Sequence, residues 1–349
     1  MNCPPRVSRR LLMGGAVVAA AALALPGLRA QSRLETTKIS LAVEGRAALC
    51  HLPLTIAEQL GYFREEGLEV WISDFDSQAA AVRAVTQGEA EVCAGLFENT
   101  IYLQAQNQLF QSLVLQGRAP QMVLGVSSRS VPRYQAMADL KGRKIGVPAL
   151  GSSAHMMASL ALLKGGLAAH EMCFVGVGAA PDALHALCSG QVDALSHTDP
   201  VMTLLEQHGE IRIISDTRTL KGAAQVFGGA MPAACLYAPL AFIQKNPNTC
   251  QALVNAMVHG LKWLQTAGPG DIINCVPERY RLGDSGLYLA SFNKVREAIS
   301  HDGLMPGDGP ATALRALARF DASIQPGKIV LASTSTNVFA CRAKARFKA

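Results

Sequence analysis

A loop near the middle of the chain carries residue types that can bind a small anion or polar solute. Gly151, Ser152 and Ser153 follow the apolar segment 145–147, which predicts a strand, and precede a stretch that predicts a long helix with His155 in its first turn. Unpaired backbone N–H groups and the positive end of the helix dipole favour an anion there. Ser152 can equally cap the helix, and the two roles are compatible. The Gly-x-x-x-x-Gly-Lys pattern of nucleotide-binding loops is absent.

A second loop of the same kind follows the apolar segment 92–94. It contains Gly95, Phe97 and Glu98. Phe97 can give an apolar wall, and Glu98 can contact a donor group on a ligand. Glu98 can also serve only to place a negative charge in the first turn of the helix that follows, and both interpretations stay open.

Three further loops hold polar candidates for ligand binding. Gly45 and His51 follow the first predicted strand, Asp74 follows the second, and Thr198 and Asp199 follow a strand in the second half of the chain. A solvent-facing histidine is the simpler alternative for His51. Because a proline follows Asp199, this residue has the sequence of a helix N-cap, and Thr198 is the better ligand contact.

No arrangement of residues predicts catalysis or a metal site. The sequence contains no G-x-S-x-G and no H-E-x-x-H. Its nine cysteines have no C-x-x-C spacing, so a zinc site is not expected, and any disulfide pairing stays open. We therefore predict a protein that binds a small molecule, is not an enzyme and needs no cofactor or metal.

The elements that must position these loops occur twice. Segments 84–92 and 186–194 each contain the end of an amphipathic helix, a glycine, an acidic residue and a short apolar strand. Glycine suits the left-handed position that ends a helix. Upstream of each segment, a strand at 39–43 or 145–147 leads into a helix. Two such βαβα units predict an α/β protein with two parallel-sheet lobes, whose strand ends face each other across a cleft.

Two segments whose composition breaks the helix and strand patterns set the expected boundaries of these lobes. The polar segment 127–134 predicts the first crossing between lobes, and the Gly- and Ala-rich segment 221–229 predicts the return. The first lobe then comprises residues 36–127 and 228–342, the second lobe residues 128–227, and residues 343–349 form a loose tail. Helices are expected at 53–65, 77–86, 254–264, 287–299 and 311–320, and the strand at 123–126 is assigned to the first lobe.

Composition indicates a globular protein and excludes a nucleic-acid-binding surface. Of 349 residues, 50% are hydrophobic and 17% charged, and the net charge is +6. Four arginines and no acid lie in the first thirty residues; removing those four leaves 28 basic residues against the 26 acids, a net charge of +2. The basic character therefore belongs mainly to the N-terminal segment.

That N-terminal segment resembles an export signal. Arg9 and Arg10 precede the apolar stretch 11–28, and Arg29 and Ala30 follow it. Adjacent arginines before an apolar core are typical of twin-arginine leaders. A single membrane anchor is the alternative, but glycines and a proline dilute the stretch. We expect residues 1–30 to be an export signal, cleaved near Ala30, and the mature protein to be periplasmic.

With these features in place, the chain resembles the solute-binding proteins of bacterial ABC importers, in the nitrate/sulfonate/taurine-type group that includes the NMT1/THI5-like proteins. Two segments in combination carry the resemblance most specifically: 61–68, which contains Gly-Tyr-Phe and Glu-Gly-Leu, and 138–147, which reads Ala-Asp-Leu-Lys-Gly-Arg-Lys-Ile-Gly-Val. The other matching segments are 52–60, 69–70, 151–153, 189–194 and 198–201.

The resemblance implies a type II periplasmic-binding-protein fold, with two α/β lobes on a two-stranded hinge that close on a small molecule. It also implies a membrane permease and ATPase as partners, and a monomeric protein. Loops beginning at Gly45, Ser73, Gly95, Gly151 and His197 would line the ligand, expected to be an anionic sulfonate, carboxylate or nitrate. The sequence departs from the family by placing Cys50 and His51 where aromatic residues are frequent.

Two other functions remain as alternatives on this scaffold. The thiamine-pyrimidine synthases resemble the family, but they carry a run of adjacent cysteines that this sequence lacks. An exported sensor that presents its ligand to a membrane receptor is the second alternative. Neighbouring permease and ATPase genes would favour the importer.

Overall fold

The computed structural model describes residues 1, 33–281 and 283–349, and residues 34–349 pack as one unit. The predicted export signal, apart from Met1, lies outside the described residues. Within the described ranges, no helix is both long and apolar enough to cross a membrane.

The first sheet confirms the βαβ pattern of the N-terminal half. Its strands are β1 (Lys38–Glu44), β2 (Glu69–Phe75), β3 (Val92–Leu96), β4 (Phe110–Leu115) and β10 (Ala234–Pro239), in the order β2-β1-β3-β10-β4. Strand β1 is parallel to both β2 and β3, whereas β10 is antiparallel to β3 and β4. The carboxyl ends of β1, β2 and β3 therefore meet at one edge of the sheet.

The second sheet repeats this topology. Its strands are β5 (Met122–Ser127), β6 (Lys144–Val147), β7 (Cys173–Gly176), β8 (Ala194–Thr198) and β9 (Ile211–Asp216), in the order β7-β6-β8-β5-β9. Strand β6 is parallel to β7 and β8, and β5 is antiparallel to β8 and β9. Each sheet thus receives its antiparallel central strand from the segment that has just crossed from the other lobe. The duplicated α/β architecture predicted from the sequence is confirmed.

Strand β5 corrects one expectation. The sequence analysis assigned residues 123–126 to the first lobe, but β5 is hydrogen bonded between β8 and β9 in the second sheet. All six of its residues are buried, which suits a central strand of either sheet, so the apolar pattern alone cannot tell the two apart. The first crossing is therefore the segment 116–121, and the polar segment 127–134 forms the end of β5 and the turn after it.

The return crossing also differs from the expectation. Residues 220–227 form helix α8 (Leu220–Phe227) instead of a connecting segment. Thr219 caps this helix by accepting a hydrogen bond from the N–H of Gly222 at 3.0 Å, and Gly228 ends it with φ of 78°. The chain then returns to the first sheet through residues 229–233.

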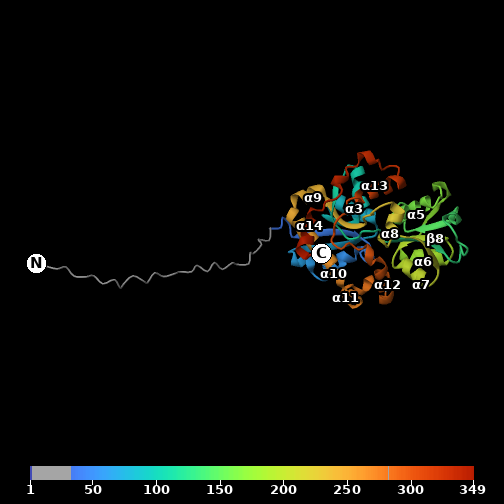
Figure 1. The fold of residues 1–349 in the computed structure, drawn as a ribbon, viewed down its shortest axis with the longest axis horizontal. Helices are drawn as coiled ribbons and strands as arrows, with labels where there is room; N and C mark the ends of the chain where they lie inside the picture. Colours follow the sequence, from blue (N-terminus) through green and yellow to red (C-terminus); the bar gives the residue numbers. More distant parts are fainter. Residues whose placement is uncertain (2–32, 282) are drawn as a thin grey trace. The chain divides into compact units, whose positions relative to one another are not determined.

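Helices cover both faces of each sheet (Figure 1). Those around the second sheet are α5 (Ser153–Lys164), α6 (Ala180–Cys188), α7 (Val201–Gln207) and α8. Those of the first lobe are α1 (Leu52–Gln59), α2 (Tyr62–Glu65), α3 (Gln78–Thr86), α4 (Glu98–Ala105), α9 (Leu240–Lys245), α10 (Pro247–Thr266), α11 (Pro269–Cys275), α12 (Ser285–Val295), α13 (Gly309–Phe320) and α14 (Val338–Phe347). Among the short 3-10 helices, η1 (Leu49–His51) joins β1 to α1. The single helix expected at 53–65 is divided at Gly61, which has φ of 78°.

The C-terminal residues are not a loose tail as expected. They belong to α14, which packs on α10 and buries Phe339, Ala340 and Ala343. Lys344 forms an ion pair with Asp302 at 2.8 Å, and Arg346 forms one at 2.8 Å with Glu66, the C-cap residue of α2. The basic composition of the segment suggested a solvated end, whereas the apolar residues between the basic ones form a helix face.

Candidate functional site

The carboxyl end of β3 and the start of α5 meet between the lobes. Glu98 is the first residue of α4, directly beyond β3, and Ser153 is the first residue of α5, beyond β6. The Ser153 hydroxyl donates a hydrogen bond of 2.5 Å to Oε1 of Glu98, which joins the two lobes. Gly95 of β3 allows the close approach of Tyr237 from β10, because a Cβ at this position would lie 3.1 Å from Oη of Tyr237.

Glu98 is a buried carboxylate. Its relative exposure is 4%, and burial raises its pKa, while the hydrogen bond from Ser153 acts in the opposite direction. Among the described residues, no basic side chain forms an ion pair with it. A buried carboxylate of this kind calls for a donor group or a positive charge from another source.

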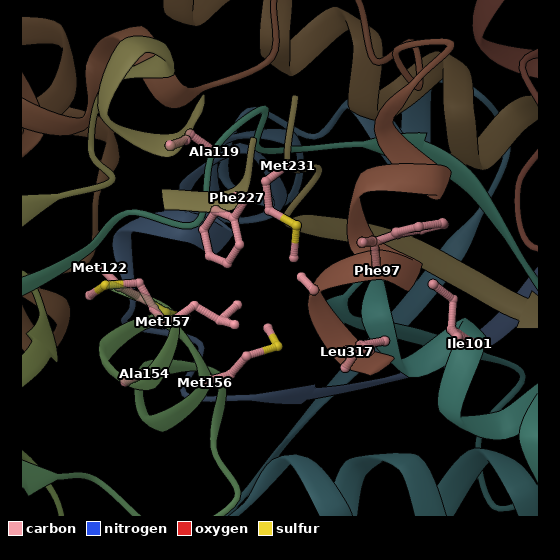
Figure 2. Packing of buried hydrophobic residues seen from close by; sticks show 14 of the residues in the cluster. Phe97, Ile101, Ala119, Met122, Ala154, Met156, Met157, Phe227, Met231 and Leu317 are labelled. Atoms are coloured by element: carbon pink, nitrogen blue, oxygen red, sulfur yellow. The ribbon is translucent and has the colours of Figure 1, made fainter. Parts of the chain in front are cut away.

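A small pocket surrounds Glu98 and Ser153. Its other lining residues are almost all apolar: Leu96, Pro120, Met122, Met156, Phe227, Met231, Pro232 and Ala233. They come from both lobes and from both crossing segments. Figure 2 shows Met156 of the second lobe directed toward the same space as Phe227 and Met231. The space between these side chains is about 10 Å³, close to what one water molecule needs.

The loop before α5 is organised by its own side chains. Ser152 caps α5 by accepting a hydrogen bond of 3.3 Å from the N–H of His155, so the capping role is observed. Nδ1 of His155 in turn accepts a hydrogen bond of 2.9 Å from the N–H of Gly151. The imidazole ring lies edge-on to Phe174 of β7 and to Phe320 of α13, and burial lowers its pKa.

The sequence predicted Asp199 as the N-cap of α7, whereas the N-cap is Pro200. The Asp199 carboxylate does bind the first turn of this helix. Its Oδ1 accepts hydrogen bonds from the N–H of Thr203 at 2.8 Å and from Oγ1 of Thr203 at 2.7 Å. Its Oδ2 accepts a hydrogen bond of 3.3 Å from Arg218. Thr198 is half-buried beside it, and its N–H donates to the ring of His197 at 2.9 Å.

Arg218 is a buried cation that sequence reasoning missed. It is 3% exposed and forms a bidentate pair with Asp216, with Nη2 to Oδ2 at 2.6 Å, in addition to its contact with Asp199. Glu206 lies 3.6 Å from the same guanidinium and also pairs with Lys294 of α12, which connects the lobes at a second place. Three carboxylates surround Arg218, so its charge is already compensated.

The loops after β1 and β2 are joined to each other. Asp74 accepts hydrogen bonds from the N–H of Arg46 at 3.2 and 3.3 Å, and Gly45 turns the chain there with φ of 63°. The Arg46 guanidinium forms an ion pair with Glu58. His51 lies next to this loop with 4% exposure, so it does not face solvent, and burial lowers its pKa to about 4.

Of the twelve predicted site residues, the pocket is lined by two, Glu98 and Ser153. Phe97 is fully buried in the core beside it, on the far side from Met122 in Figure 2. The pocket lining does not include the remaining nine: Gly45, His51, Asp74, Gly95, Gly151, Ser152, His155, Thr198 and Asp199.

The apolar lining was missed because it comes from segments outside the strand-end loops. Pro120 lies in the first crossing, and Met231 and Pro232 lie in the second. The signal in the sequence that could have indicated this apolar lining is a proline in each crossing segment with a methionine within two residues of it. Met156 and Phe227 lie within helical patterns that read as ordinary core.

The described residues offer no metal centre and no disulfide. No group of three or more His, Cys, Asp or Glu side chains in the described ranges is arranged to hold a metal ion. The eight cysteines from Cys50 to Cys341 are free thiols.

Comparison with known proteins identifies the family. The NMT1/THI5-like family profile matches residues 49–267, well over half of the chain. The chain belongs to the NMT1/THI5-like family. Among curated proteins, a search gave no match.

Several solved structures match over almost the whole chain. A protein from Bordetella bronchiseptica RB50 is 50% identical, and the match covers 91% of this chain and 100% of that one with a TM-score of 0.83. The alkanesulfonate-binding protein SsuA of Xanthomonas axonopodis pv. citri, solved with MOPS, is 17% identical with a TM-score of 0.68, covering 87% and 99%. The periplasmic nitrate-binding protein NrtA of Synechocystis PCC 6803 is 12% identical with a TM-score of 0.69, covering 90% and 89%. The last two share the periplasmic-binding-protein fold with this NMT1/THI5-like protein.

Proposed function

We propose that this protein is the solute-binding component of an ABC importer, and that it captures a small organic solute between its two lobes. The pocket at Glu98 and Ser153 carries the proposal, because it is formed by both lobes and both crossing segments. Family membership and the fold shared with sulfonate- and nitrate-binding proteins support it.

Closure of the lobes follows from the size of the pocket. A space of about 10 Å³ holds no organic solute, so a solute enters only when the lobes move apart. A solute that contacts both lobes then stabilises a closed state that is wider at this pocket than the one described. Opening would break polar interactions between the lobes that include Glu98–Ser153, Lys294–Glu206 and the hydrogen bond from the N–H of Leu220 to Glu297.

The partners follow from this role. The loaded protein docks on a membrane permease, which an ATPase drives, and the solute is released unchanged. We place the protein in the periplasm, reached through the twin-arginine signal predicted at residues 1–30, and expect it to act as a monomer.

The class of solute expected from the sequence was anionic: a sulfonate, a carboxylate or nitrate. The sulfonate- and nitrate-binding neighbours support that class. The lining of the pocket weighs against it, since the described residues that form it include a buried carboxylate and no lysine, arginine or histidine. We therefore keep the importer role and take the solute class from the pocket itself, as argued below.

Native mass spectrometry of the protein purified from its own periplasm tests the proposal. We expect a co-purifying small molecule that is lost after mild denaturation and that raises the melting temperature when it is added back unchanged. Recovery of a chemically altered molecule after incubation would contradict the proposed role. So would a protein that carries no solute and that no metabolite extract stabilises.

A further inference from the structure

The interlobe pocket contains a buried carboxyl group, Glu98, in apolar surroundings, and no basic side chain of the described residues forms an ion pair with it. We propose that its ligand is an organic ammonium compound with an apolar body, and that Glu98 is the counter-ion of the ammonium group. This inference rests on the proposed function and names the class of solute that the same site would take.

The first argument is charge. Glu98 is 4% exposed, and its hydrogen-bond donors are neutral: the Ser153 hydroxyl and its own backbone N–H. Two cations at the contacts between the lobes are paired with other carboxylates: Arg218 with Asp216 at 2.6 Å and Lys294 with Glu206. A carboxylate removed from water with no cation beside it is costly, and a cationic ligand removes that cost by forming the pair.

The second argument is the remainder of the lining. Met122, Met156 and Met231 provide three thioethers, and Phe227 provides an aromatic ring. Methionine side chains are flexible and polarisable, so they can repack around apolar bodies of different shapes. An ammonium group close to an aromatic face gains a further electrostatic attraction. These residues suit the hydrocarbon part of the solute, while Glu98 fixes the orientation of its charged end.

The same geometry disfavours an anion in this pocket. A sulfonate or carboxylate would lie near the Glu98 carboxylate with low-dielectric side chains around both, where repulsion between like charges is strong. The prolines at positions 120 and 232 lack N–H groups, so at those two places the crossing segments offer no backbone donor to an oxyanion. Selectivity for positive charge is the expected property of the site.

Calorimetric and thermal-shift titrations with matched probes test the inference on the full mature chain. The probes are benzylamine, butylamine and cyclohexylamine, each compared with the sulfonate and the alcohol of the same carbon skeleton. We expect at least one amine to bind tenfold or more tightly than its sulfonate and its alcohol. Glu98→Gln should weaken that amine tenfold or more, because the amide keeps the shape and removes the charge.

Glu89→Gln is the control variant, since it removes the same charge from an exposed side chain outside the pocket. It should leave amine binding within about twofold of the unmodified protein. The comparison of amine with sulfonate needs no variant, so it stays informative even if Glu98→Gln fails to fold.

The outcomes separate this inference from the proposed function. Preferential binding of the sulfonates, stronger still in Glu98→Gln, would overturn the ammonium class and leave solute capture intact. Amines that bind equally well to Glu98→Gln, or no binding of any amine, would also overturn it. If, in addition, no solute co-purifies with the native protein, the proposed function fails as well.

Discussion

The buried imidazole of His51 makes a measurable prediction for stability against pH. His51 is 4% exposed, and burial lowers its pKa from 6.5 to about 4. Below pH 6.5 the unfolded chain binds a proton at this histidine that the folded protein does not bind until the pH approaches 4. The unfolded state is then favoured as the pH falls, so the contribution of His51 to stability is complete above pH 6.5 and is lost toward pH 4.

The size of the effect follows from the two pKa values. Between pH 8 and pH 5, the difference in protons bound by the unfolded and folded states at this site, integrated over pH, is about 1.5. The free energy of unfolding therefore falls by about 2 kcal/mol over this range. Urea unfolding of the wild-type protein and of His51→Gln at pH 8, 6.5 and 5 measures it. The variant should lose about 2 kcal/mol less than the wild type over this range, whatever its stability at pH 8.

A matched control and a clear negative result complete this experiment. His208→Gln replaces an exposed histidine and is the matched control variant. If the wild type and His51→Gln lose equal free energy between pH 8 and pH 5, the imidazole is not held neutral by burial, and the reasoning is refuted.

Two further predictions concern packing, and urea unfolding at pH 7.5 measures both. Phe339→Ala should lower the free energy of unfolding by about 3–5 kcal/mol, because Phe339 is 6% exposed in the contact between α14 and α10. Val338→Ala, at a side chain that is 53% exposed, should change it by less than about 0.5 kcal/mol. Equal effects of the two substitutions would show that the C-terminal segment does not pack as a helix on the first lobe. Gly222→Ala should lower the free energy of unfolding by about 3 kcal/mol or more, because its Cβ would lie 1.7 Å from the carbonyl oxygen of Asp216. Gly270→Ala, with no atom within 4 Å of its Cβ, should be neutral or stabilising by about 0.5–1 kcal/mol. If Gly222→Ala were as stable as the wild type, the close contact at the start of α8 would be contradicted.

The sequence was most informative where a pattern is local. The repeated helix–Gly–strand units predicted the parallel strands β1, β2 and β3 of one sheet and β6, β7 and β8 of the other. The cap sequence at Ser152 predicted the observed start of α5. Strand β5 was misassigned because hydrogen bonding to β8 and β9, which is not local, decides its sheet. The last residues were misjudged because the partners of Lys344 and Arg346 lie far away along the chain.

The site shows the same division between local and distant information. Position at a strand end was enough to select Glu98 and Ser153, which do meet. Their neighbours Met122, Phe227 and Met231 come from a strand, a helix end and a crossing segment. They line one pocket because the two crossing segments run side by side, joined by hydrogen bonds between Gly117 and residues 233–234. The spacing of residues along the chain does not reveal a contact of this kind.

The apolar cluster between the lobes has a consequence for how the protein responds to temperature. One continuous cluster contains Phe97 and Ile101 of the first lobe, Met156 and Met157 of the second, and Leu317 of α13, which contacts both α4 and α5. Parting the lobes would therefore wet hydrocarbon surface, at about 25 cal/mol for every Å². That penalty carries a large heat capacity and weakens on cooling. The open conformation should therefore be more populated in the cold than in the warm. Its apolar interlobe side chains would then be accessible to hydrophobic dyes and to neighbouring molecules.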